Sequence, residues 1–341
     1  MSVDITNNCN LRCLHCFNRS GNDLVRNELS DEEFINLAKE ISENNLYTFC
    51  FCGGEPLLRY DLLLKMCDIL SPHINNINMV SNGYLMTKEK ALELKKHGMK
   101  HIQISIDGCS SKSHDYMRGV KGSYEKAINA VKAINSANLS VGIAFSPTSF
   151  NITEFPKVVE NLNEISNLHS IRVQPLMSLG RASLNSILPT ENQYRELVNF
   201  IDKYNSQNLS FPKKIEWGDP IDHLIRYPEL LDATLHGHIN SDGSLTASVY
   251  LPIILGNIRN HSFKEYWNSG LNRAFKIPFI HDLSQNITSI SELGTSSENF
   301  PKLFFAENIT VDLIDDDIFN NLNKFKLSNL KGGVFVDNTF K

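Results

Sequence analysis

The sequence predicts an α/β protein built around a parallel β-sheet. Up to about residue 182, short apolar segments alternate with amphipathic helical patterns, and the connections are long enough to join parallel strands in right-handed βαβ units. Six such repeats fit an open sheet or a barrel that is complete or partial, and the repeats alone do not choose between them. The chain of 341 residues is long enough for one large domain or for two to three smaller ones.

Each repeat begins with a short strand and continues into a helix. The predicted strands are Val3–Thr6, Tyr47–Phe51, Ile77–Ser81, His101–Ile106, Leu139–Phe145 and Ser170–Gln174. The first helical stripe follows Ser30, which is a suitable N-cap because acidic residues fill the next turn. Four further helical patterns begin near Leu62, after Thr87, after Ser123 and at Phe155.

The pattern changes after Gly180. The segments predicted there are a helix at Thr190–Asn205, strands at Leu209–Phe211 and Ile215–Trp217, a hairpin within Ile239–Val249, a helix at His261–Leu271 and a last helix at Asp315–Phe325. Asp242-Gly243 lies between two alternating runs, which is typical of a hairpin turn. Apart from its last helix, the segment from Lys276 to Lys341 is polar and is predicted to be irregular.

Composition excludes several classes of function. The chain has 33 Lys and Arg against 38 Asp and Glu, a formal charge of -5, without the clustered basic residues of a nucleic-acid surface. It has no run of about 18 apolar residues that would cross a membrane, and its start lacks the charged and apolar regions of a secretory signal. We therefore expect a cytoplasmic protein that binds neither nucleic acid nor membrane.

Three of the seven cysteines lie within eight residues, at Cys9, Cys13 and Cys16. The odd total and the expected location argue against a disulfide framework and favour metal binding or redox chemistry. The three follow the first strand, at the end where α/β folds place their active sites. Three thiolates can hold three irons of a four-iron cluster and leave the fourth iron open. A zinc site or free thiols remain the alternatives, although His15 is poorly placed as a fourth zinc ligand.

Four further segments follow in order along the predicted strand ends. They are Gly53-Gly54-Glu55-Pro56, Ser81-Asn82-Gly83, Ser105-Ile106-Asp107-Gly108 and His114-Asp115-Tyr116-Met117-Arg118-Gly119. Together with the Cys-x-x-x-Cys-x-x-Cys motif, this set resembles the peptide-modifying branch of the radical S-adenosylmethionine (radical SAM) superfamily over about residues 2–182. The resemblance implies a partial (β/α)6 TIM-like barrel that carries one 4Fe–4S cluster on the three cysteines. It also implies cleavage of S-adenosylmethionine to a 5′-deoxyadenosyl radical, which abstracts hydrogen from a substrate.

The same resemblance assigns the residues around S-adenosylmethionine. Cofactor contacts are expected from His15, Gly53, Gly54, Glu55, Pro56, Ser81, Asn82, Ser105, Asp107 and Arg118. The glycines allow a close backbone approach, and Glu55 is expected to meet the amino group. Ser105 and Asp107 are expected on the ribose hydroxyls. Arg118 suits a bidentate pair with the methionyl carboxylate, and His15 is expected near the adenine. Plain turns, a helix cap and a surface salt bridge are the structural alternatives.

Beyond residue 180 the chain resembles the C-terminal extension called SPASM or twitch. The similar segments are Gly180-Arg181-Ala182, Ser241-Asp242-Gly243-Ser244-Leu245, Leu255-Gly256-Asn257-Ile258 and Ser262-Phe263-Lys264-Glu265-Tyr266-Trp267. Three parts are thus expected: a core barrel at 1–182, the extension at 183–275 and a tail with a helix at 276–341. The extension normally binds auxiliary clusters through cysteines, yet none follows Cys109, and Thr234 and Ser248 stand near the expected ligand positions. We therefore expect a single cluster and a cluster-free extension. The scattered histidines there, expected to be surface or core residues rather than ligands, are His223, His236, His238 and His261.

Without an auxiliary cluster to accept an electron, redox-neutral epimerisation becomes more attractive than oxidative crosslinking, which stays open. Epimerisation needs a hydrogen donor, and the remaining thiols are Cys50, Cys52, Cys67 and Cys109. Cys52 and Cys109 are the first catalytic candidates because each adjoins a motif, whereas Cys67 lies on an apolar helix face and is expected to pack. Cys50 and Cys52 are expected to alternate on their strand, so that only one faces the barrel interior.

The branch that the sequence resembles implies a ribosomally synthesised precursor peptide as substrate. It also implies an electron donor such as flavodoxin or ferredoxin. Two alternatives remain, namely a radical SAM enzyme that acts on a small-molecule metabolite and a non-catalytic relative that binds a leader peptide.

Overall fold

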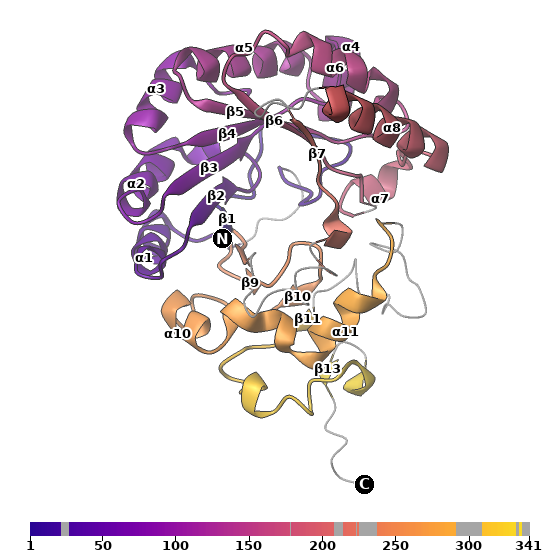
Figure 1. Ribbon diagram of the computed structural model, residues 1–341. Coiled ribbons are helices and arrows are strands. Elements are labelled where there is room, and N and C mark those ends of the chain that lie inside the picture. The colour runs from indigo at the N-terminus through magenta and orange to yellow at the C-terminus, as the bar shows by residue number, and fades with distance from the viewer. Residues whose placement is uncertain are drawn as a thin grey trace.

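The computed structural model describes residues 1–21, 27–177, 179–207, 214–222, 224, 237–290, 309–331 and 334–335. Its largest element is a nine-stranded sheet in the order β7-β6-β5-β4-β3-β2-β1-β8-β9. Strands β1 to β7 are parallel and follow one another in chain order. Figure 1 shows this sheet curving, with the helices that connect its strands on the outer side. This arrangement confirms the predicted partial barrel.

The elements agree closely with the predicted repeats. The parallel strands are β1 (Ser2–Asp4), β2 (Thr48–Cys52), β3 (Asn76–Ser81), β4 (His101–Ser105), β5 (Ser140–Phe145), β6 (Leu168–Val173) and β7 (Lys214–Trp217). The α-helices up to residue 207 are α1 (Asp31–Ser42), α2 (Tyr60–Leu70), α3 (Lys88–Lys96), α4 (Ser111–Arg118), α5 (Ser123–Ser136), α6 (Phe155–Asn161), α7 (Ala182–Asn185) and α8 (Glu191–Gln207). The 3-10 helices are η1 (Pro56–Arg59), η2 (Ile152–Glu154), η3 (Leu271–Lys276), η6 (Ile318–Asn320) and η7 (Leu327–Asn329).

Local capping explains where the first helices begin. The Ser30 hydroxyl accepts the N–H of Glu33 at 3.2 Å, and the Glu33 carboxylate accepts the N–H of Ser30 at 2.7 Å, which closes a capping box. The Thr87 hydroxyl accepts the N–H of Lys90 at 3.2 Å and starts α3 in the same way. Both helix starts were predicted from the sequence.

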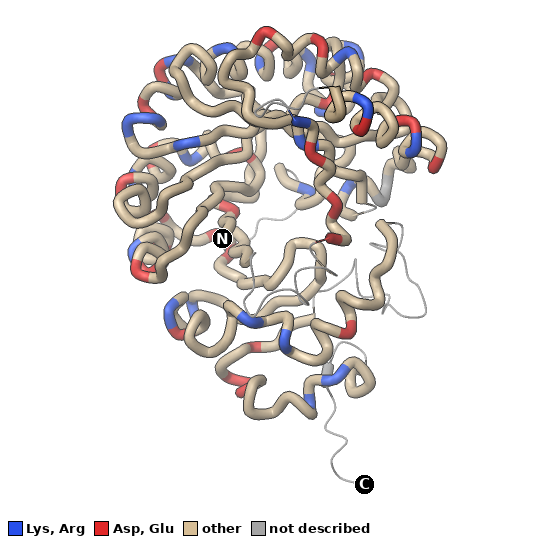
Figure 2. Tube along the Cα trace, viewed as in Figure 1, with Lys and Arg blue, Asp and Glu red and all other residues tan. Residues whose placement is uncertain are grey.

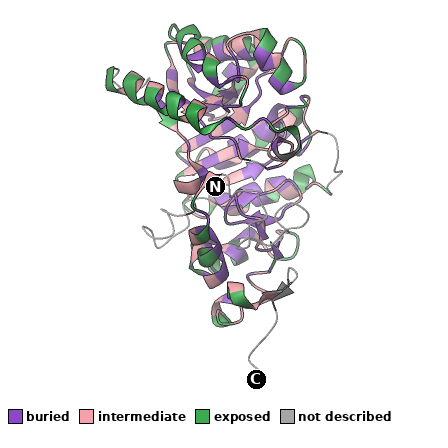
Figure 3. Ribbon diagram, turned by 90° about the vertical axis from the view of Figure 1, so that its right-hand side faces the viewer, coloured by how far each residue is buried: buried purple, intermediate pink, exposed green. Residues whose placement is uncertain are grey.

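Strand alternation separates an apolar face from a polar one. On β2, Phe49 and Phe51 are fully buried against the outer helices, while the residues between and after them face the other side. We call that second side the inner face. Strand register places on it Ser2, Asp4, Thr48, Cys50, Cys52, Asn76, Asn78, Val80, His101, Gln103, Ser105, Ser140, Gly142, Ala144, Ser170, Arg172, Lys214, Glu216 and His238. Figure 3 shows buried residues along the strands and exposed ones on the outer sides of the helices.

The sheet continues past residue 182, where the core barrel was predicted to end. Strand β7 extends it at one edge, and β8 (His238–Ile239) pairs in parallel with β1 at the other. Strand β9 (Leu245–Thr246) pairs antiparallel with β8, which confirms the hairpin predicted around Asp242-Gly243. The remaining elements are β10 (Ile253–Ile254), α10 (Phe263–Asn268), α11 (Pro278–Asn286), β11 (Ile309–Thr310), β12 (Leu330–Lys331) and β13 (Val334–Phe335). The predicted strand at Leu209–Phe211 lies outside the described residues.

Two predictions for the tail are wrong. Helix α11 forms where irregular structure was expected, because Phe279, Ile280 and Leu283 give it a buried apolar face. The helix predicted at Asp315–Phe325 is reduced to the single turn η6. The Asp312 carboxylate accepts the N–H of Asp315 at 3.2 Å, and Asp317 adopts a left-handed φ of 47°. Short polar side chains here form hydrogen bonds with nearby backbone groups, and these bonds replace those of a regular helix.

Charged residues of both signs occur along the described part of the chain. Figure 2 shows Lys and Arg interspersed with Asp and Glu along the outer helices. Among the described residues, no helix combines the length and the apolar character needed to cross a membrane.

Candidate active site

Cys9, Cys13 and Cys16 lie in the loop that follows β1. Cys13 is buried, Cys9 and Cys16 are half-buried, and all three are free thiols. Among the described residues, one group of three potential metal ligands has all its ligand atoms within 4.8 Å of one another, and it does not include these cysteines. At least two of the three sulfurs are therefore more than 4.8 Å apart. Thiolates on a single tetrahedral zinc would stand about 4 Å apart. A four-iron cluster gives each thiolate its own iron and so fits the wider spacing better.

The surroundings of these sulfurs suit thiolates that are bound to a metal. Burial raises the pKa of Cys9 to about 11 and also raises that of Cys13, so both stay protonated until a cation compensates the charge. The backbone N–H of Leu11 donates to Cys9 Sγ at 3.4 Å, and that of Ser20 donates to Cys16 Sγ at 3.3 Å. Each of these N–H groups would stabilise an anionic sulfur.

A segment far along the chain holds this loop in place. The Arg181 side chain donates from Nε to the carbonyl of Cys13 at 2.8 Å and from Nη1 to the carbonyl of Ser20 at 3.0 Å. The backbone N–H of Arg181 donates to the carbonyl of Cys16 at 2.9 Å. Gly180 has φ +58°, and a Cβ there would come within 2.3 Å of the Cys16 carbonyl. The sequence marked Gly180 and Arg181 only by resemblance. Their contact with the cysteine loop was not predicted, because 168 positions separate Arg181 from Cys13.

The Gly53-Gly54 turn packs directly against the same loop. A Cβ on Gly54 would lie 2.0 Å from the Asn8 carbonyl, and one on Gly53, at φ +127°, would lie 2.3 Å from the Thr6 carbonyl. The Gly54 N–H donates to the backbone carbonyl of Thr6 at 2.8 Å. Close backbone approach is therefore the reason for both glycines, as predicted, and the partner seen here is the protein's own loop.

Glu55 joins two of the predicted motifs. Its buried carboxylate accepts the Ser81 hydroxyl at 2.9 Å, the Asn82 N–H at 2.8 Å and the Leu57 N–H at 3.1 Å, and burial raises its pKa. Asn82 in turn donates to the side chain of Asn10 at 2.9 Å. The Glu55 side chain has no exposed surface, so its observed task is to tie the second and third strand ends to the cysteine loop. Its contact with the amino group of S-adenosylmethionine stays a prediction.

Asp107 and Arg118 form a buried ion pair beside the loop. Arg118 Nη2 lies 2.5 Å from Asp107 Oδ2, and Nη1 lies 3.6 Å from Cys13 Sγ. Burial works to raise the pKa of Asp107, but Arg118 and then His15, whose Nε2 lies 3.8 Å away, hold it below the ordinary value. The Ser146 N–H donates to Asp107 Oδ1 at 2.9 Å. The two side chains predicted to contact ribose and carboxylate thus contact each other.

Several buried polar atoms here have no protein partner. They are Asn10 Nδ2, His15 Nδ1 and Arg118 Nε. Burial lowers the pKa of His15 to about 4, so its ring is neutral near pH 7. Buried polar groups are normally satisfied, and unpaired ones beside a loop of thiols suit a polar ligand such as S-adenosylmethionine, whose carboxylate accepts hydrogen bonds. Ser105 ends β4 on the inner face, half-buried.

The structure separates the candidate hydrogen donors. Cys50 and Cys52 are two positions apart, and their Sγ atoms lie 3.4 Å from each other. The expectation that only one of them faces inward is wrong, because side chains two apart on a strand share a face. Cys67 is fully buried in the apolar core, as predicted. Cys109 instead lies among α5, α6 and Glu154, which accepts its N–H at 2.9 Å. That position is on the outer side of the sheet and does not support Cys109 as a donor.

Among the histidines of the extension, His238 is buried in the sheet. Its Nδ1 lies 2.8 Å from the Ser2 hydroxyl, and its Nε2 lies 3.5 Å from Asp4 Oδ2. His223, His236 and Thr234 lie outside the described residues. Ser248 is buried, and its hydroxyl accepts the N–H of Tyr250.

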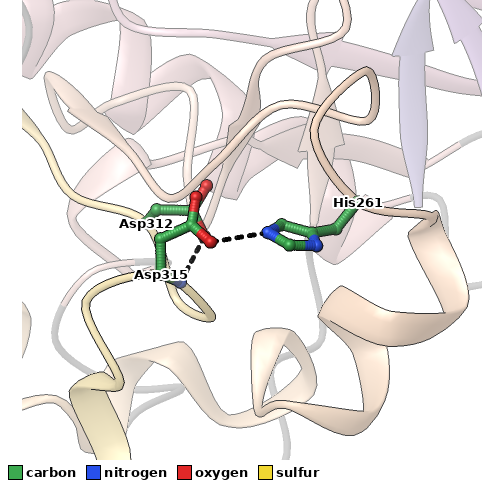
Figure 4. A group of neighbouring side chains, drawn as sticks. All are labelled: His261, Asp312 and Asp315. Atoms are coloured by element: carbon green, nitrogen blue, oxygen red, sulfur yellow. Dashed lines mark hydrogen bonds and ion pairs between the residues drawn. The ribbon is translucent and has the colours of Figure 1, made fainter.

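His261, Asp312 and Asp315, drawn in Figure 4, are the group among the described residues whose ligand atoms all lie within 4.8 Å of one another. His261 Nε2 lies 2.7 Å from Asp315 Oδ1, and the Tyr266 hydroxyl donates to Asp312 at 2.6 Å. These contacts join the residues around α10 to the tail, and this structural role explains why the three side chains lie close together.

Comparison with known proteins identifies the barrel. The model of the radical SAM superfamily matches residues 3–165. Residues 3–165 form a radical SAM domain. Members use a 4Fe–4S cluster and S-adenosylmethionine, and these are its cofactors.

Its relatives differ in their named activities. An AdoMet-dependent heme synthase of Oleidesulfovibrio alaskensis is 28% identical over 312 residues, covering 82% of this chain and 77% of that protein. The sporulation killing factor maturation protein SkfB of Bacillus subtilis is 31% identical over 183 residues, covering 53% of this chain and 43% of that protein. The structure of anSMEcpe with bound AdoMet and Cp18Cys peptide shares the fold with a TM-score of 0.63 at 20% identity, covering 89% of this chain and 86% of that one.

Proposed function

We propose that this radical SAM enzyme modifies a ribosomally synthesised precursor peptide, either by inverting an α-carbon or by forming a crosslink. The similarity to SkfB and the fold shared with a peptide-bound structure support a peptide substrate. When bound, the cluster and S-adenosylmethionine supply a 5′-deoxyadenosyl radical that takes hydrogen from the substrate. Cys9, Cys13 and Cys16 would hold the cluster. The chain's other residues bind and orient its partners.

The observation that carries this proposal is the chemistry of the inner face. Its charged side chains are Asp4, Arg172 and, on the exposed β7, Lys214 and Glu216, and burial lowers the pKa of His101 to about 4, so that this ring is neutral. The other positions are uncharged and mostly small or able to hydrogen-bond. Such a surface suits backbone amides. Its cations are Arg172 and the exposed Lys214, and Glu216 lies beside Arg172, so the face offers little positive charge to a substrate with several carboxylates, such as a tetrapyrrole.

Arg118, Asp107, His15 and Asn10 are proposed to surround the carboxylate end of S-adenosylmethionine. Arg118 is paired with Asp107 while its Nε lacks a partner, so a bound carboxylate can be taken up by the free edge of the guanidinium. Asp107 keeps the guanidinium charged and fixed in orientation. His15 and Asn10 offer the neighbouring unpaired groups. Glu55 serves the site indirectly, by holding the strand ends to the cysteine loop.

The extension is proposed to contain no auxiliary cluster and to serve as scaffold and substrate dock. No cysteine follows Cys109 in the sequence. Tyr250 belongs to the extension, and its hydroxyl accepts a hydrogen bond from Gln174, directly after β6, at 3.0 Å. A docked peptide would thus run between the extension and the inner face. Flavodoxin or ferredoxin is the proposed electron donor.

A tetrapyrrole or another metabolite is the second candidate substrate. The heme synthase relative favours it, because that match covers 82% of this chain. The two candidates differ in their products. An inverted amino-acid α-carbon can arise only in a peptide, whereas a reaction at a tetrapyrrole carboxylate leaves every peptide unchanged.

Two measurements test the proposal in order. Anaerobically reconstituted protein should hold about four irons and form 5′-deoxyadenosine, and the triple substitution of the three cluster cysteines by alanine should abolish both. Co-expression with a precursor peptide in deuterated water should then give one deuterium for inversion or a loss of two hydrogens for crosslinking. Turnover of a tetrapyrrole with no change in any peptide would overturn the peptide assignment.

A further inference from the structure

Arg172 is a cation on the inner face that lacks an anionic partner. It is half-buried on β6, and strand register pairs it with Ala144 on β5 and with Glu216 on β7. Its Nε is buried without a hydrogen-bond partner. Within the described part of the chain, the guanidinium forms no hydrogen bond or ion pair, and its two terminal nitrogens are not fully buried. These nitrogens are therefore open to a ligand.

Neighbouring groups hold the Arg172 side chain without neutralising it. A Cβ on Gly218 would lie 2.5 Å from Arg172 Nε, so the backbone after β7 packs against that side of the guanidinium. Glu216 is exposed, and among the described residues no ion pair joins it to Arg172. Asp219 accepts the N–H of Ile221 at 2.8 Å. The charge of the guanidinium thus stays available.

Strand register also places Arg172 level with the proposed cofactor site. Ser105 pairs with Ala144 and Ala144 pairs with Arg172, so two strand spacings, or about 10 Å, separate the backbones of Ser105 and Arg172. Ser105 is expected to contact the ribose of S-adenosylmethionine, and the reacting residue of a substrate would lie near it. An extended peptide advances about 3.3 Å per residue, so a group bound at Arg172 would lie within about three residues of the reacting one.

The extension lies over the inner face next to Arg172. The Tyr250 hydroxyl accepts a hydrogen bond from Gln174, which follows Arg172 by two positions. Burial raises the pKa of Tyr250, and the hydrogen bond from Gln174 and the nearby charge of Arg172 both oppose that rise. Arg172 therefore lies close to the place between the extension and the inner face where we propose that the peptide docks.

Arg118 and Arg172 are the two arginines of the described residues that bury an unpaired Nε. Arg118 is paired with Asp107 and is expected to contact the carboxylate of S-adenosylmethionine. Arg172 is not committed to that contact. A planar guanidinium can form two parallel hydrogen bonds with a carboxylate, which are stronger than those with a neutral acceptor. A carboxylate is therefore the ligand that suits Arg172 best.

We propose that Arg172 binds a carboxylate of the substrate and so selects a precursor peptide that carries Asp or Glu within about three residues of the residue that reacts. A single carboxylate agrees with the low positive charge of the rest of the inner face. The inference rests on the proposed peptide substrate and names a feature of it.

The test uses the full-length, reconstituted enzyme. The probe is the precursor peptide that wild type modifies in deuterated water, synthesised with each Asp and Glu replaced in turn by Asn or Gln. With the parent peptide, Arg172→Gln should lower kcat/KM by about 10- to 100-fold, as expected for the loss of a charged hydrogen-bonded contact. Iron content and 5′-deoxyadenosine formation without peptide should not change. Lys214→Gln removes the exposed cation of the same face and is the matched control, which should change kcat/KM by less than about twofold.

One change in the peptide should reproduce the effect of Arg172→Gln. With wild type, a single Asp→Asn or Glu→Gln peptide should react about as slowly as the parent peptide does with Arg172→Gln. Combining the two changes should cause no further loss, and this non-additivity identifies the bound carboxylate. Arg172→Lys keeps the charge but not the paired geometry, so it should show a smaller loss with the same peptide dependence. It replaces Arg172→Gln in the test if that variant loses iron.

The outcomes separate the two proposals. Turnover of a tetrapyrrole by wild type, with no change in any peptide, would overturn the proposed function, and no variant is needed to see it. Equal kcat/KM for wild type and Arg172→Gln would leave the peptide substrate in place and overturn the carboxylate site. A loss in Arg172→Gln that adds to the effect of every peptide substitution would overturn it as well.

Discussion

Replacing Arg181 by alanine is expected to loosen the cysteine loop and weaken its hold on iron. The guanidinium donates to two loop carbonyls, at 2.8 and 3.0 Å. A hydrogen bond from a charged group contributes about 1.5–3 kcal/mol, and the lower value applies to a half-buried side chain. Two such bonds amount to about 3 kcal/mol. Because each 1.4 kcal/mol is a factor of ten, the ordered loop becomes disfavoured by about 100-fold.

The assay follows iron and fold separately. Reconstituted wild type and Arg181→Ala are exposed to an iron chelator while charge-transfer absorbance and bound iron are recorded, and circular dichroism monitors the helices. The variant should lose iron far faster at unchanged helix content. Arg181→Lys keeps the charge but cannot reach both carbonyls, so it should lie between them. Arg195→Ala removes an exposed arginine on α8 and is the matched control. If Arg181→Ala kept its iron as firmly as Arg195→Ala, the contact from the start of α7 would have no part in holding the loop.

Three further predictions concern the neighbouring contacts and the extension. Gly54→Ala should lower the unfolding free energy by about 1–3 kcal/mol and impair iron loading, since its Cβ would overlap the Asn8 carbonyl; a variant with normal denaturant midpoint and iron would contradict this. Asp107→Asn should destabilise the apo-protein by about 3 kcal/mol by leaving Arg118 buried without a counter-charge, and added S-adenosylmethionine should raise its melting temperature more than that of wild type. Hydrogen bonding to a carboxylate raises the pKa of His261, so its contribution to stability is present at low pH and fades as pH rises above about 6.5 through the folded-state value. Urea midpoints of wild type minus His261→Asn, measured from pH 5 to 9, should fall over that range, and a flat difference would contradict the assignment.

The sequence predicted what depends on short-range patterns. The six strands lie within two residues of their expected ends because apolar alternation and turn residues are local signals. Ser30 and Thr87 start helices through contacts three residues away. Since the strands are parallel, the motifs after them were bound to meet at one edge of the sheet.

What the sequence could not predict depends on long-range contacts. Arg181 contacts Cys13, which is 168 positions away in the sequence, and Asp107 forms an ion pair with Arg118. The error over Cys50 and Cys52 was of a different kind, since the period of a strand already places residues two apart on one face. Correct use of that period would have suggested the thiol contact.

The placement of the seven cysteines narrows the chemistry of the protein. Three form the loop after β1, Cys67 is packed in the apolar core and Cys109 faces the outer helices. Only Cys50 and Cys52 remain on the inner face, and no cysteine follows in the extension to hold a second cluster. In the proposed reaction, a substrate radical formed against this face would meet thiols, which give hydrogen atoms, and not a cluster that accepts electrons. This distribution makes return of hydrogen the outcome that the chain's own residues support most directly.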